Sequence, residues 1–202
     1  MNRKRVLVSG AGIAGLTFAI QLKQNGFEPV VIERDKALRP DGYMMDFFGT
    51  GWDDAHRMGL TERLRAIRYP ISALAFVDDE GQPYQRVPIE RIRSALGGNY
   101  IYLRRPDLER GLAERARELS IAIVYGASLH RLHTLRNYVH ATFVDGKVDD
   151  FDLVVGADGV HSAVRRLACG VHREFTRFLG LYVAAFHLTD GADRLAGMCK
   201  LY

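Results

Sequence analysis

The alternation of apolar and polar residues divides the start of the chain into predicted elements. Residues 5–9 and 29–32 are apolar runs of strand length, and residues 16–25 repeat apolar positions at helical spacing. Three glycines lie in residues 10–15, between the first strand and the helix. This order of strand, glycine turn, helix and strand predicts a βαβ unit with parallel strands.

The middle of the chain departs from this order. Residues 52–58 and 61–67 have the pattern of two short helices, with Thr61 as the expected N-cap of the second. Residues 72–77 and 82–88 have the pattern of strands, and the polar turn between them predicts a hairpin. A hairpin is foreign to a sheet of parallel strands, so we expect it to join a second sheet.

The second half of the chain is predicted to contain a helix followed by several strands. The helix is expected at residues 106–119, because proline occupies its first turn and apolar residues recur at helical spacing. The expected strands are residues 121–124, 128–133, 138–143, 151–155 and 178–188, with a short helix from Ser162.

The three glycines of the turn have separate physical roles. Gly10 permits a sharp exit from the strand, Gly12 lets backbone N–H groups approach a pyrophosphate, and Gly15 allows close packing of helix and sheet. The start of the helix then offers unpaired N–H groups and the positive end of its dipole to two phosphates. Glu33 ends the second strand, where an acid accepts hydrogen bonds from a ribose diol. The pattern therefore predicts an adenine dinucleotide as cofactor.

Composition excludes several classes of function. The 202 residues are 48% hydrophobic and 26% charged, as in a soluble protein of one domain or slightly more. The net charge of +4 comes without a basic tract, so we expect no nucleic-acid partner. No apolar run approaches the ~18 residues of a membrane span, so we expect no membrane partner. The two cysteines are too few for a disulfide framework and favour a cytoplasmic location. No histidine has metal-ligand spacing, so we expect no metal site.

Three further motifs follow in the chain. Residues 105–108 are Arg-Pro-Asp-Leu, and residues 156–165 are Gly-Ala-Asp-Gly-Val-His-Ser-Ala-Val-Arg. Arg39, Gly42 and Asp46 form the third, looser motif. With the glycine turn, these motifs resemble the single-component FAD-dependent monooxygenases that share the p-hydroxybenzoate hydroxylase type of fold. The spacing of Arg39 and Asp46 is similar to that in the tetracycline-inactivating branch.

The resemblance implies roles for particular residues. In that branch the arginine matching Arg39 is linked to NADPH, and the acid matching Asp46 is linked to FAD. Arg105 is implied to lie on the flavin side, and Asp158 and Gly159 belong to a motif associated with FAD and NAD(P)H. No catalytic residue is assigned, because the family needs none at a fixed motif position. The expected cofactor-binding residues are Gly10, Ala11, Gly12, Ile13, Ala14, Gly15, Glu33, Arg34, Arg39, Asp46, Arg105, Asp158 and Gly159.

Each assignment has a purely structural alternative. Glu33 and Arg34 could form a solvated pair at the end of a strand, and Asp46 could be a surface acid. Arg105 could neutralise a neighbouring acid, which would leave Arg104 as the functional arginine. Asp158 could cap the short helix that follows it, as aspartate often does.

The resemblance also implies an activity. NAD(P)H would reduce FAD, dioxygen would form a C4a-hydroperoxyflavin, and an aromatic or polyketide-like small molecule would be hydroxylated. The same glycine turn serves an NAD-dependent dehydrogenase, and a truncated module that binds nucleotide without catalysis is the third possibility. The Asp158-Gly159 motif and Arg105 favour the flavoprotein, because a simple dehydrogenase has no reason to carry them.

The expected fold class is α/β, with a Rossmann-like FAD-binding domain followed by part of an antiparallel-sheet substrate domain. We expect residues 1–70 and 101–170 in the FAD-binding domain, and residues 71–100 and 171–202 in the substrate domain. Complete enzymes of this type are nearly twice as long, and their Gly-Asp motif has no match after Gly170. The chain therefore resembles an N-terminal portion, whose activity alone is left open. Unpaired strands in its substrate domain would favour self-association.

Overall fold

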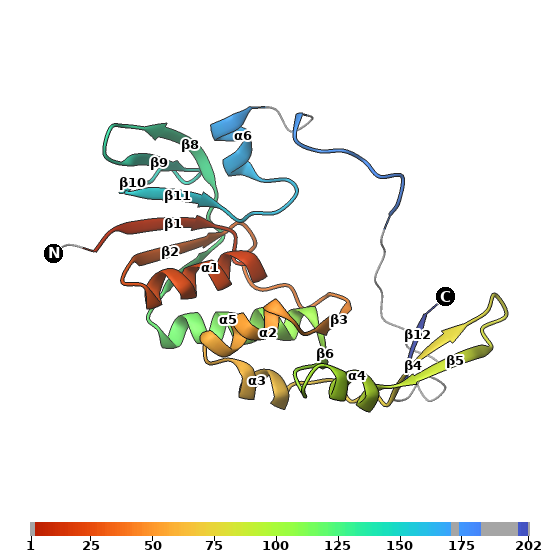
Figure 1. The fold of residues 1–202 in the computed structure, drawn as a ribbon. Helices are drawn as coiled ribbons and strands as arrows, with labels where there is room; N and C mark the ends of the chain where they lie inside the picture. Colours follow the sequence, from red (N-terminus) through yellow and green to blue (C-terminus); the bar gives the residue numbers. More distant parts are fainter. Residues whose placement is uncertain (1–2, 171–173, 183–197, 202) are drawn as a thin grey trace. The chain divides into compact units, whose positions relative to one another are not determined.

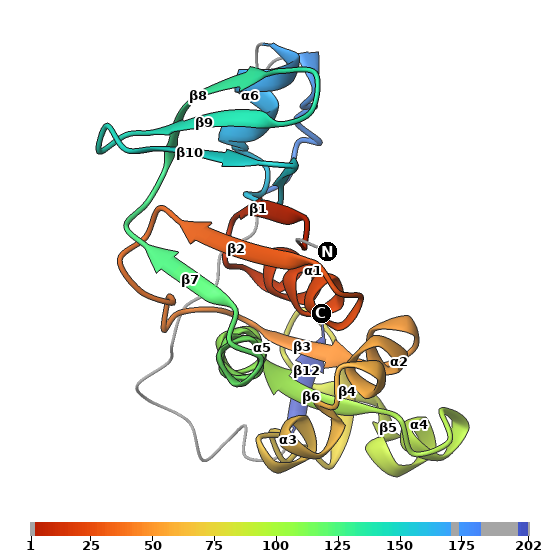
Figure 2. The same ribbon diagram turned by 90° about the vertical axis from the view of Figure 1, so that its left-hand side faces the viewer.

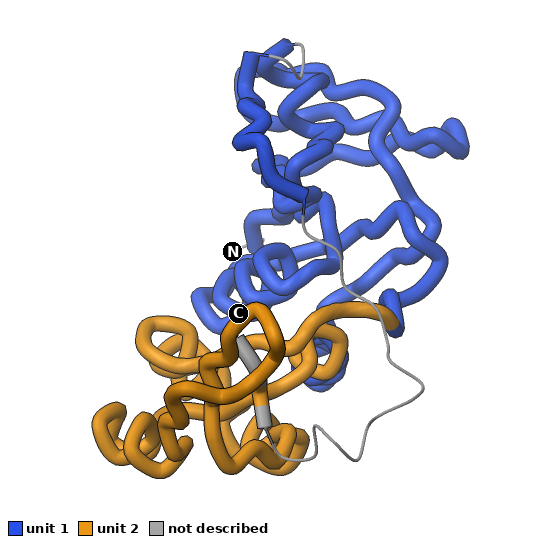
Figure 3. The backbone as a smooth tube through the Cα atoms, turned by 90° about the vertical axis from the view of Figure 1, so that its right-hand side faces the viewer, with its two compact units in different colours: residues 1–40, 109–182 blue, residues 41–108, 183–202 orange. Residues whose placement is uncertain are grey.

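The chain packs into two compact units. The structure is a computed structural model that describes residues 3–170, 174–182 and 198–201. Residues 1–40 and 109–182 form the first unit, and residues 41–108 and 183–202 form the second (Figure 3). Residues 41–70, which the sequence assigned to the FAD-binding domain, thus pack within the second unit. Compact packing does not by itself define a functional domain, so the predicted domain boundaries stay a prediction.

A four-stranded parallel sheet forms the centre of the first unit. Its strand order is β11 (Leu153–Gly156), β1 (Arg5–Ser9), β2 (Glu28–Glu33) and β7 (Ala122–Tyr125). Helix α1 (Ile13–Gln24) connects β1 to β2. The predicted βαβ unit is therefore confirmed.

Layers of different kinds cover the parallel sheet. Figure 1 shows α1 along β1 and β2, with three antiparallel strands and helix α6 (Ala163–Cys169) on the other side. These strands follow the order β10 (Val148–Phe151), β9 (Val139–Phe143) and β8 (Leu129–Thr134), and Figure 2 shows them from a second side. Helix α5 (Arg105–Glu118) contributes its residues from Glu109 onward to this unit. The expected α/β class is confirmed.

Alternation along the parallel strands divides the core between the two layers. Leu7 and Ile32 point to the antiparallel sheet, where they pack in one buried cluster with Phe151. Val6 and Val8 are also fully buried, and alternation directs them to the opposite face of the sheet. The buried cluster beneath the antiparallel sheet comprises Leu7, Ile32, Leu129, Ala141, Phe151 and Val164.

An ion pair joins β1 to β10. The Arg5 guanidinium donates two hydrogen bonds to the Asp149 carboxylate, at 2.8 and 2.7 Å. The same guanidinium lies 4.7 Å from the centre of the Phe151 ring. The hydrogen bonds to Arg5 lower the pKa of Asp149 and keep it charged. Phe151 is therefore held by apolar packing on one side and by a cation on the other.

The described residues of the second unit form two small sheets and three helices, beside the first residues of α5. Strands β3 (Met44–Phe47) and β6 (Ile101–Arg104) form an antiparallel ribbon. The other sheet contains the predicted hairpin and has the order β12 (Met198–Leu201), β4 (Ala73–Val77) and β5 (Pro83–Pro88), with β12 parallel to β4. The hairpin's place in a separate sheet is thus confirmed. The helices are α2 (Thr50–Arg57), α3 (Thr61–Ala66) and α4 (Ile89–Ala95). None of the described helices is long and apolar enough to cross a membrane.

Two predicted details are wrong for local reasons. Thr61 is not an N-cap but the first residue of α3; Leu60 occupies the cap position, and no side-chain hydrogen bond forms there. The predicted strand at residues 151–155 is two strands separated by Asp152. Asp152 donates its N–H to the Arg5 carbonyl at 2.9 Å and accepts the Arg5 N–H at 2.7 Å, which turns the chain from one sheet to the other.

The predicted strand at residues 178–188 is not confirmed. Residues 178–182 are not in a strand, and residues 183–188 lie outside the described residues. Gly180 has a left-handed φ of 83°, which interrupts an extended run. Leu179, Leu181 and Tyr182 are at least 79% exposed. The predicted self-association through unpaired strands stays a prediction.

The buried cluster predicts unequal costs for two substitutions in β10. Phe151→Ala should lower the free energy of unfolding by about 3–5 kcal/mol, because it empties a filled core position. Val148→Ala on the same strand should cost less than about 1 kcal/mol, because Val148 is 57% exposed. Urea unfolding followed by circular dichroism measures both values. Equal losses would contradict this description of the core.

Candidate functional site

The glycine turn brings backbone atoms closer than any side chain would permit. A Cβ atom at Gly15 would lie 1.9 Å from the Gly10 carbonyl oxygen. A Cβ at Gly10 would lie 2.5 Å from the Ala157 carbonyl oxygen, and Gly10 also has a left-handed φ of 112°. These two glycines are therefore required by the packing of β1, α1 and the residues after β11.

Gly12 has space around it, in contrast to Gly10 and Gly15. The nearest atom to a Cβ built there would be Oε1 of Glu109, at 3.7 Å. Gly12 is the N-cap of α1, with no side-chain hydrogen bond at the cap and no acid in the first turn. The first N–H groups of a helix have no partner within the helix and attract anions. Amides without a partner in the helix, at a glycine that is less crowded than its neighbours, suit a pyrophosphate.

Glu33 is tied directly to the glycine turn. Its Oε2 accepts the Ala11 N–H at 2.9 Å, and its Oε1 accepts the Asp35 N–H at 3.0 Å. The side chain is half-buried at the end of β2. A carboxylate offers about four acceptor positions, so two remain for hydroxyl groups. The structure thus brings the predicted acid to the predicted phosphate turn.

The Gly156–Gly159 motif lies against the same turn. Ala157 donates its N–H to the Ser9 carbonyl at 2.8 Å, and the Asp158 Cα is 3.0 Å from a Cβ built at Gly10. The glycine turn and the segment after β11, which are far apart in the sequence, are therefore adjacent in the first unit.

The side chain of Asp158 helps to cap α6, whose N-cap residue is Ser162. Its Oδ2 accepts the N–H groups of Ala163 at 2.7 Å and Val164 at 3.2 Å, and Ser162 donates its hydroxyl to Oδ1. The structural alternative for Asp158 is therefore observed. Its predicted role as a cofactor contact stays a prediction, as does that of Gly159.

Arg34 and Arg39 lie in the loop after β2. Arg39 Nε donates to the Asp35 carboxylate at 2.6 Å, and Arg34 Nε lies 4.0 Å from the same carboxylate. The hydrogen bond that Arg39 donates to Asp35 raises the pKa of Arg39. Exposed pairs of this kind contribute little stability, so neither side chain is firmly held. Their roles as cofactor residues stay predictions.

Asp46 and Arg105 belong to the second unit. Asp46 lies on β3 opposite Tyr102 of β6, and it accepts a hydrogen bond from the Tyr100 hydroxyl. Arg105 begins α5, and its N–H donates to the Tyr43 carbonyl at 2.9 Å. A Cβ at Gly42 would lie 2.7 Å from Pro106 Cδ, so the third motif packs on the Arg-Pro-Asp-Leu motif. The cofactor roles of Asp46 and Arg105 are not tested by these contacts.

Three tyrosines near the predicted residues were not predicted from the sequence. Tyr100 and Tyr102 belong to or border β6, a strand that their alternation with Ile101 and Leu103 could have indicated. Tyr125 ends β7 in register with Glu33. Its hydroxyl oxygen is buried and finds no hydrogen-bond partner among the described residues. Burial raises the pKa of Tyr125.

The described residues contain neither a metal-ligand group nor a disulfide bond. Among the described residues, no group of three or more His, Cys, Asp or Glu side chains could hold a metal ion. Cys169 and Cys199 are both free thiols. In the first unit, the glycine turn offers backbone amides and Glu33 offers a carboxylate, donors and an acceptor that suit a nucleotide.

The sequence is similar to a known domain family over most of its length. The family model described as FAD binding domain matches residues 3–186. Protein Rv1260 of Mycobacterium tuberculosis, which is named as uncharacterized, is 35% identical over 187 residues, covering 91% of this chain and 49% of its own length. Flavin-dependent monooxygenase eupH of Phoma sp. is 32% identical over 202 residues, covering 96% of this chain and 47% of its own.

The fold is also similar to solved structures. Tetracycline destructase Tet(55) superimposes with a TM-score of 0.70 at 30% identity, covering 82% of this chain and 41% of its own. The chain thus spans about half the length of the curated relatives it matches. The resemblance to flavin-dependent monooxygenases, read from the motifs, is confirmed by these matches.

Two alanine substitutions in the glycine turn should affect different properties: Gly15→Ala the stability of the protein, and Gly12→Ala its affinity for ADP. Gly15→Ala should destabilise the protein by about 1–3 kcal/mol or more, because the methyl group overlaps a main-chain oxygen. Gly12→Ala should lower the free energy of unfolding by only about 0.5–1 kcal/mol, because a methyl group makes no close contact there and alanine is merely a poorer N-cap than glycine. The Gly12 methyl group should nevertheless weaken ADP binding about five- to hundredfold, by crowding the pyrophosphate.

Urea unfolding and calorimetric ADP titration of each variant measure these effects. A Gly12→Ala variant that binds ADP as tightly as the parent protein would contradict the placement of the phosphate site.

Proposed function

Because the chain belongs to the FAD-binding domain family, we propose that it binds FAD as part of an NAD(P)H-dependent monooxygenase. The proposed reaction is hydroxylation of an aromatic or polyketide-like small molecule, with dioxygen and NAD(P)H as cosubstrates. The names of two similar proteins support this proposal: eupH is a flavin-dependent monooxygenase, and Tet(55) is a tetracycline destructase.

The main observation in support of the proposal is the hydrogen bond from the Ala11 N–H to the Glu33 carboxylate. Because of this bond, an acid that could accept hydrogen bonds from a ribose lies beside the first amides of α1. Gly12 is less crowded than Gly10 and Gly15, because a Cβ built there would make only an ordinary contact with Glu109 Oε1 at 3.7 Å. The residues of the first unit therefore fit the adenosine diphosphate half of FAD.

The chain's own contribution is binding and orientation. The amides of Gly12, Ile13 and Ala14 would hold the pyrophosphate, and Glu33 would hold the ribose. Packing of Gly10 and Gly15 keeps these amides in place without using a side chain. FAD, when bound, supplies the exchange of hydride and the activation of dioxygen.

The remaining predicted residues are proposed contacts of the cofactors. Arg34, Arg39 and Arg105 carry positive charge that suits the phosphates of FAD or NAD(P)H. The Asp46 carboxylate could accept a hydrogen bond from a hydroxyl or N–H group. Gly159 could contribute only its main-chain N–H and carbonyl groups. Asp158, which helps to cap α6, would act by holding the segment that packs on Gly10.

The proposal predicts a coloured protein. The purified 202-residue chain should bind FAD in a 1:1 ratio, give a flavin absorption spectrum, and release unmodified FAD on denaturation. Tight binding of NADH without any affinity for FAD would instead favour the dehydrogenase. Absorption spectroscopy and chromatography of the released ligand distinguish these outcomes.

Glu33→Ala should weaken FAD binding, because it removes charge-assisted hydrogen bonds to the ribose. The expected loss is about 1.5–3 kcal/mol, or roughly a tenfold to hundredfold rise in Kd. Fluorescence titration with FAD measures it, and Glu80→Ala, in the exposed turn of the β4–β5 hairpin, is the matched control. Unchanged affinity in Glu33→Ala would show that the acid does not contact the nucleotide.

A further inference from the structure

A buried carboxylate lies beside the glycine turn and belongs to none of the motifs described above. Glu109 is on α5, among the residues of that helix that pack in the first unit, and it is only 5% exposed. Its Oε1 is the nearest atom to a Cβ built at Gly12, at 3.7 Å. Among the described residues, Glu109 is the only charged side chain that is buried. Burying a charge costs free energy, and a site for an anion is an unexpected place for a buried acid.

Negative charge near the turn comes from elements other than α1. The first turn of α1 contains no acid, so this helix offers only its amides. Glu33, at the end of β2, brings one carboxylate and accepts the Ala11 N–H. Glu109 brings a second carboxylate from α5. An anion bound at the amides therefore lies near two acids.

The effects of these two acids on other groups show that they act on one region. The hydrogen bond to Asp35 is the main cause that raises the pKa of Arg39. The charges of Glu33 and Glu109 raise it further. Burial raises the pKa of Tyr125, and the same two acids add to the rise, whereas a neighbouring arginine opposes it. Charges that favour a cation in this region repel an anion bound there.

Nucleotide phosphates differ in the charge that they bring to such a site. A phosphate linked on two sides carries a single negative charge, whereas a terminal phosphate carries about −1.5 to −2 at neutral pH. ADP has a terminal phosphate, but the pyrophosphate of a dinucleotide has none. Repulsion from a carboxylate grows with the charge of the phosphate, and salt screens it only weakly when the carboxylate is buried.

We propose that Glu109 is a specificity-determining residue of the nucleotide site. Its carboxylate disfavours a terminal phosphate at the glycine turn and thereby favours a pyrophosphate that is linked on both sides, as in a dinucleotide. The inference rests on the proposed function for the place of the pyrophosphate. It adds a selection that the amides of the turn do not make, because amides alone would favour the more highly charged terminal phosphate.

The test compares ADP with ADP-ribose, in which both phosphates are linked on two sides. Neither ligand contains a flavin, so both report on the first unit alone. Calorimetric titration at neutral pH gives the ratio of the Kd for ADP to the Kd for ADP-ribose. Glu109→Gln removes the charge and keeps the size of the side chain. It should lower this ratio about three- to tenfold, mainly by tightening the binding of ADP.

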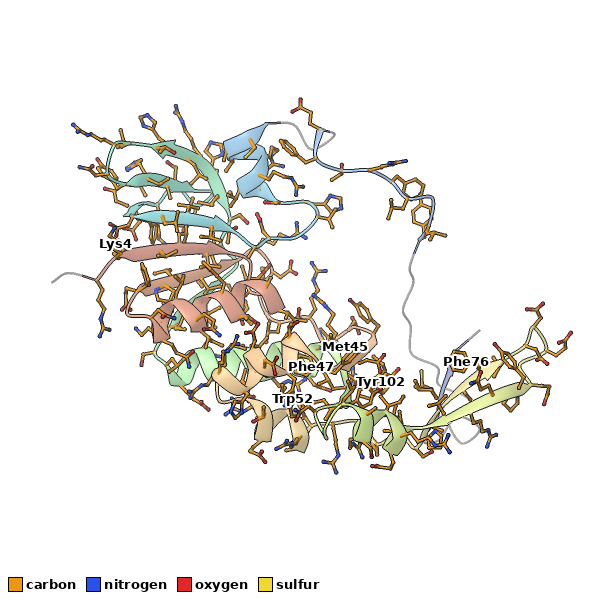
Figure 4. All side chains as sticks on the ribbon, in the orientation of Figure 1. Lys4, Met45, Phe47, Trp52, Phe76 and Tyr102 are labelled. Atoms are coloured by element: carbon orange, nitrogen blue, oxygen red, sulfur yellow. The ribbon has the colours of Figure 1, made fainter. Side chains whose placement is uncertain are left out.

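Three variants serve as controls. Glu109→Asp keeps the charge and should keep the ratio within about twofold of the parent value. Glu114→Gln removes the same charge from the exposed side of α5, and Lys4→Gln removes a charge at the opposite end of β1 from the glycine turn (Figure 4). Both should leave the ratio within about twofold of the parent value, because exposed charges far from the turn are screened by salt.

Circular dichroism of each variant identifies any loss of fold. If Glu109→Gln does not fold, Glu109→Met gives the same comparison, because methionine has a similar volume and no charge.

Two results overturn the inference. A ratio that Glu109→Gln leaves unchanged would show that Glu109 does not act on the terminal phosphate, because a merely structural role changes both affinities equally. A ratio that rises would show that Glu109 favours the terminal phosphate. Either result leaves the proposed function intact, whereas a parent protein that binds neither ADP nor ADP-ribose would contradict both the proposed function and this role of Glu109.

Discussion

The structure depends on one steric constraint, the contact of main chain with main chain at Gly10 and Gly15. A side chain at either position would lie within 2.5 Å of a carbonyl oxygen, at Ala157 for Gly10 and at Gly10 itself for Gly15. This contact lets α1 begin three residues after the end of β1 and lets the segment after β11 pack against the same turn. No side chain hydrogen-bonds to the cap of α1, so the first amides of the helix remain available to an anion.

Sequence reasoning recovered the features that depend on local pattern. The βαβ unit, the hairpin and the α/β class follow from residue spacing, and so does the place of Glu33 at the end of β2. It missed β6 and the break at Asp152, because both depend on partners distant in sequence. Asp152 turns the chain by pairing with Arg5, and β6 forms only against β3. The roles of Asp158 and Tyr100 likewise required knowledge of which groups they contact.

Each unit holds one carboxylate by hydrogen bonds, but the donors differ. In the first, the candidate site is made of backbone amides, and one carboxylate is held by N–H groups of the turn and of Asp35. In the second, a carboxylate is held by the hydroxyl of a buried tyrosine. In both, hydrogen bonds to an acid leave it with unused acceptor positions and a restricted geometry. Acids held in this way are suited to bind hydroxyl or N–H donors of a ligand.

The central claim is that the bare amides at the start of α1, together with Glu33, bind an adenosine diphosphate group. Amide chemical shifts from ¹⁵N-labelled protein test it most directly, with ADP and adenosine as the two ligands. The account predicts that ADP shifts the signals of Gly12, Ile13 and Ala14, whereas adenosine leaves them nearly unchanged because it has no phosphate. ADP binding that leaves these three signals in place would contradict it.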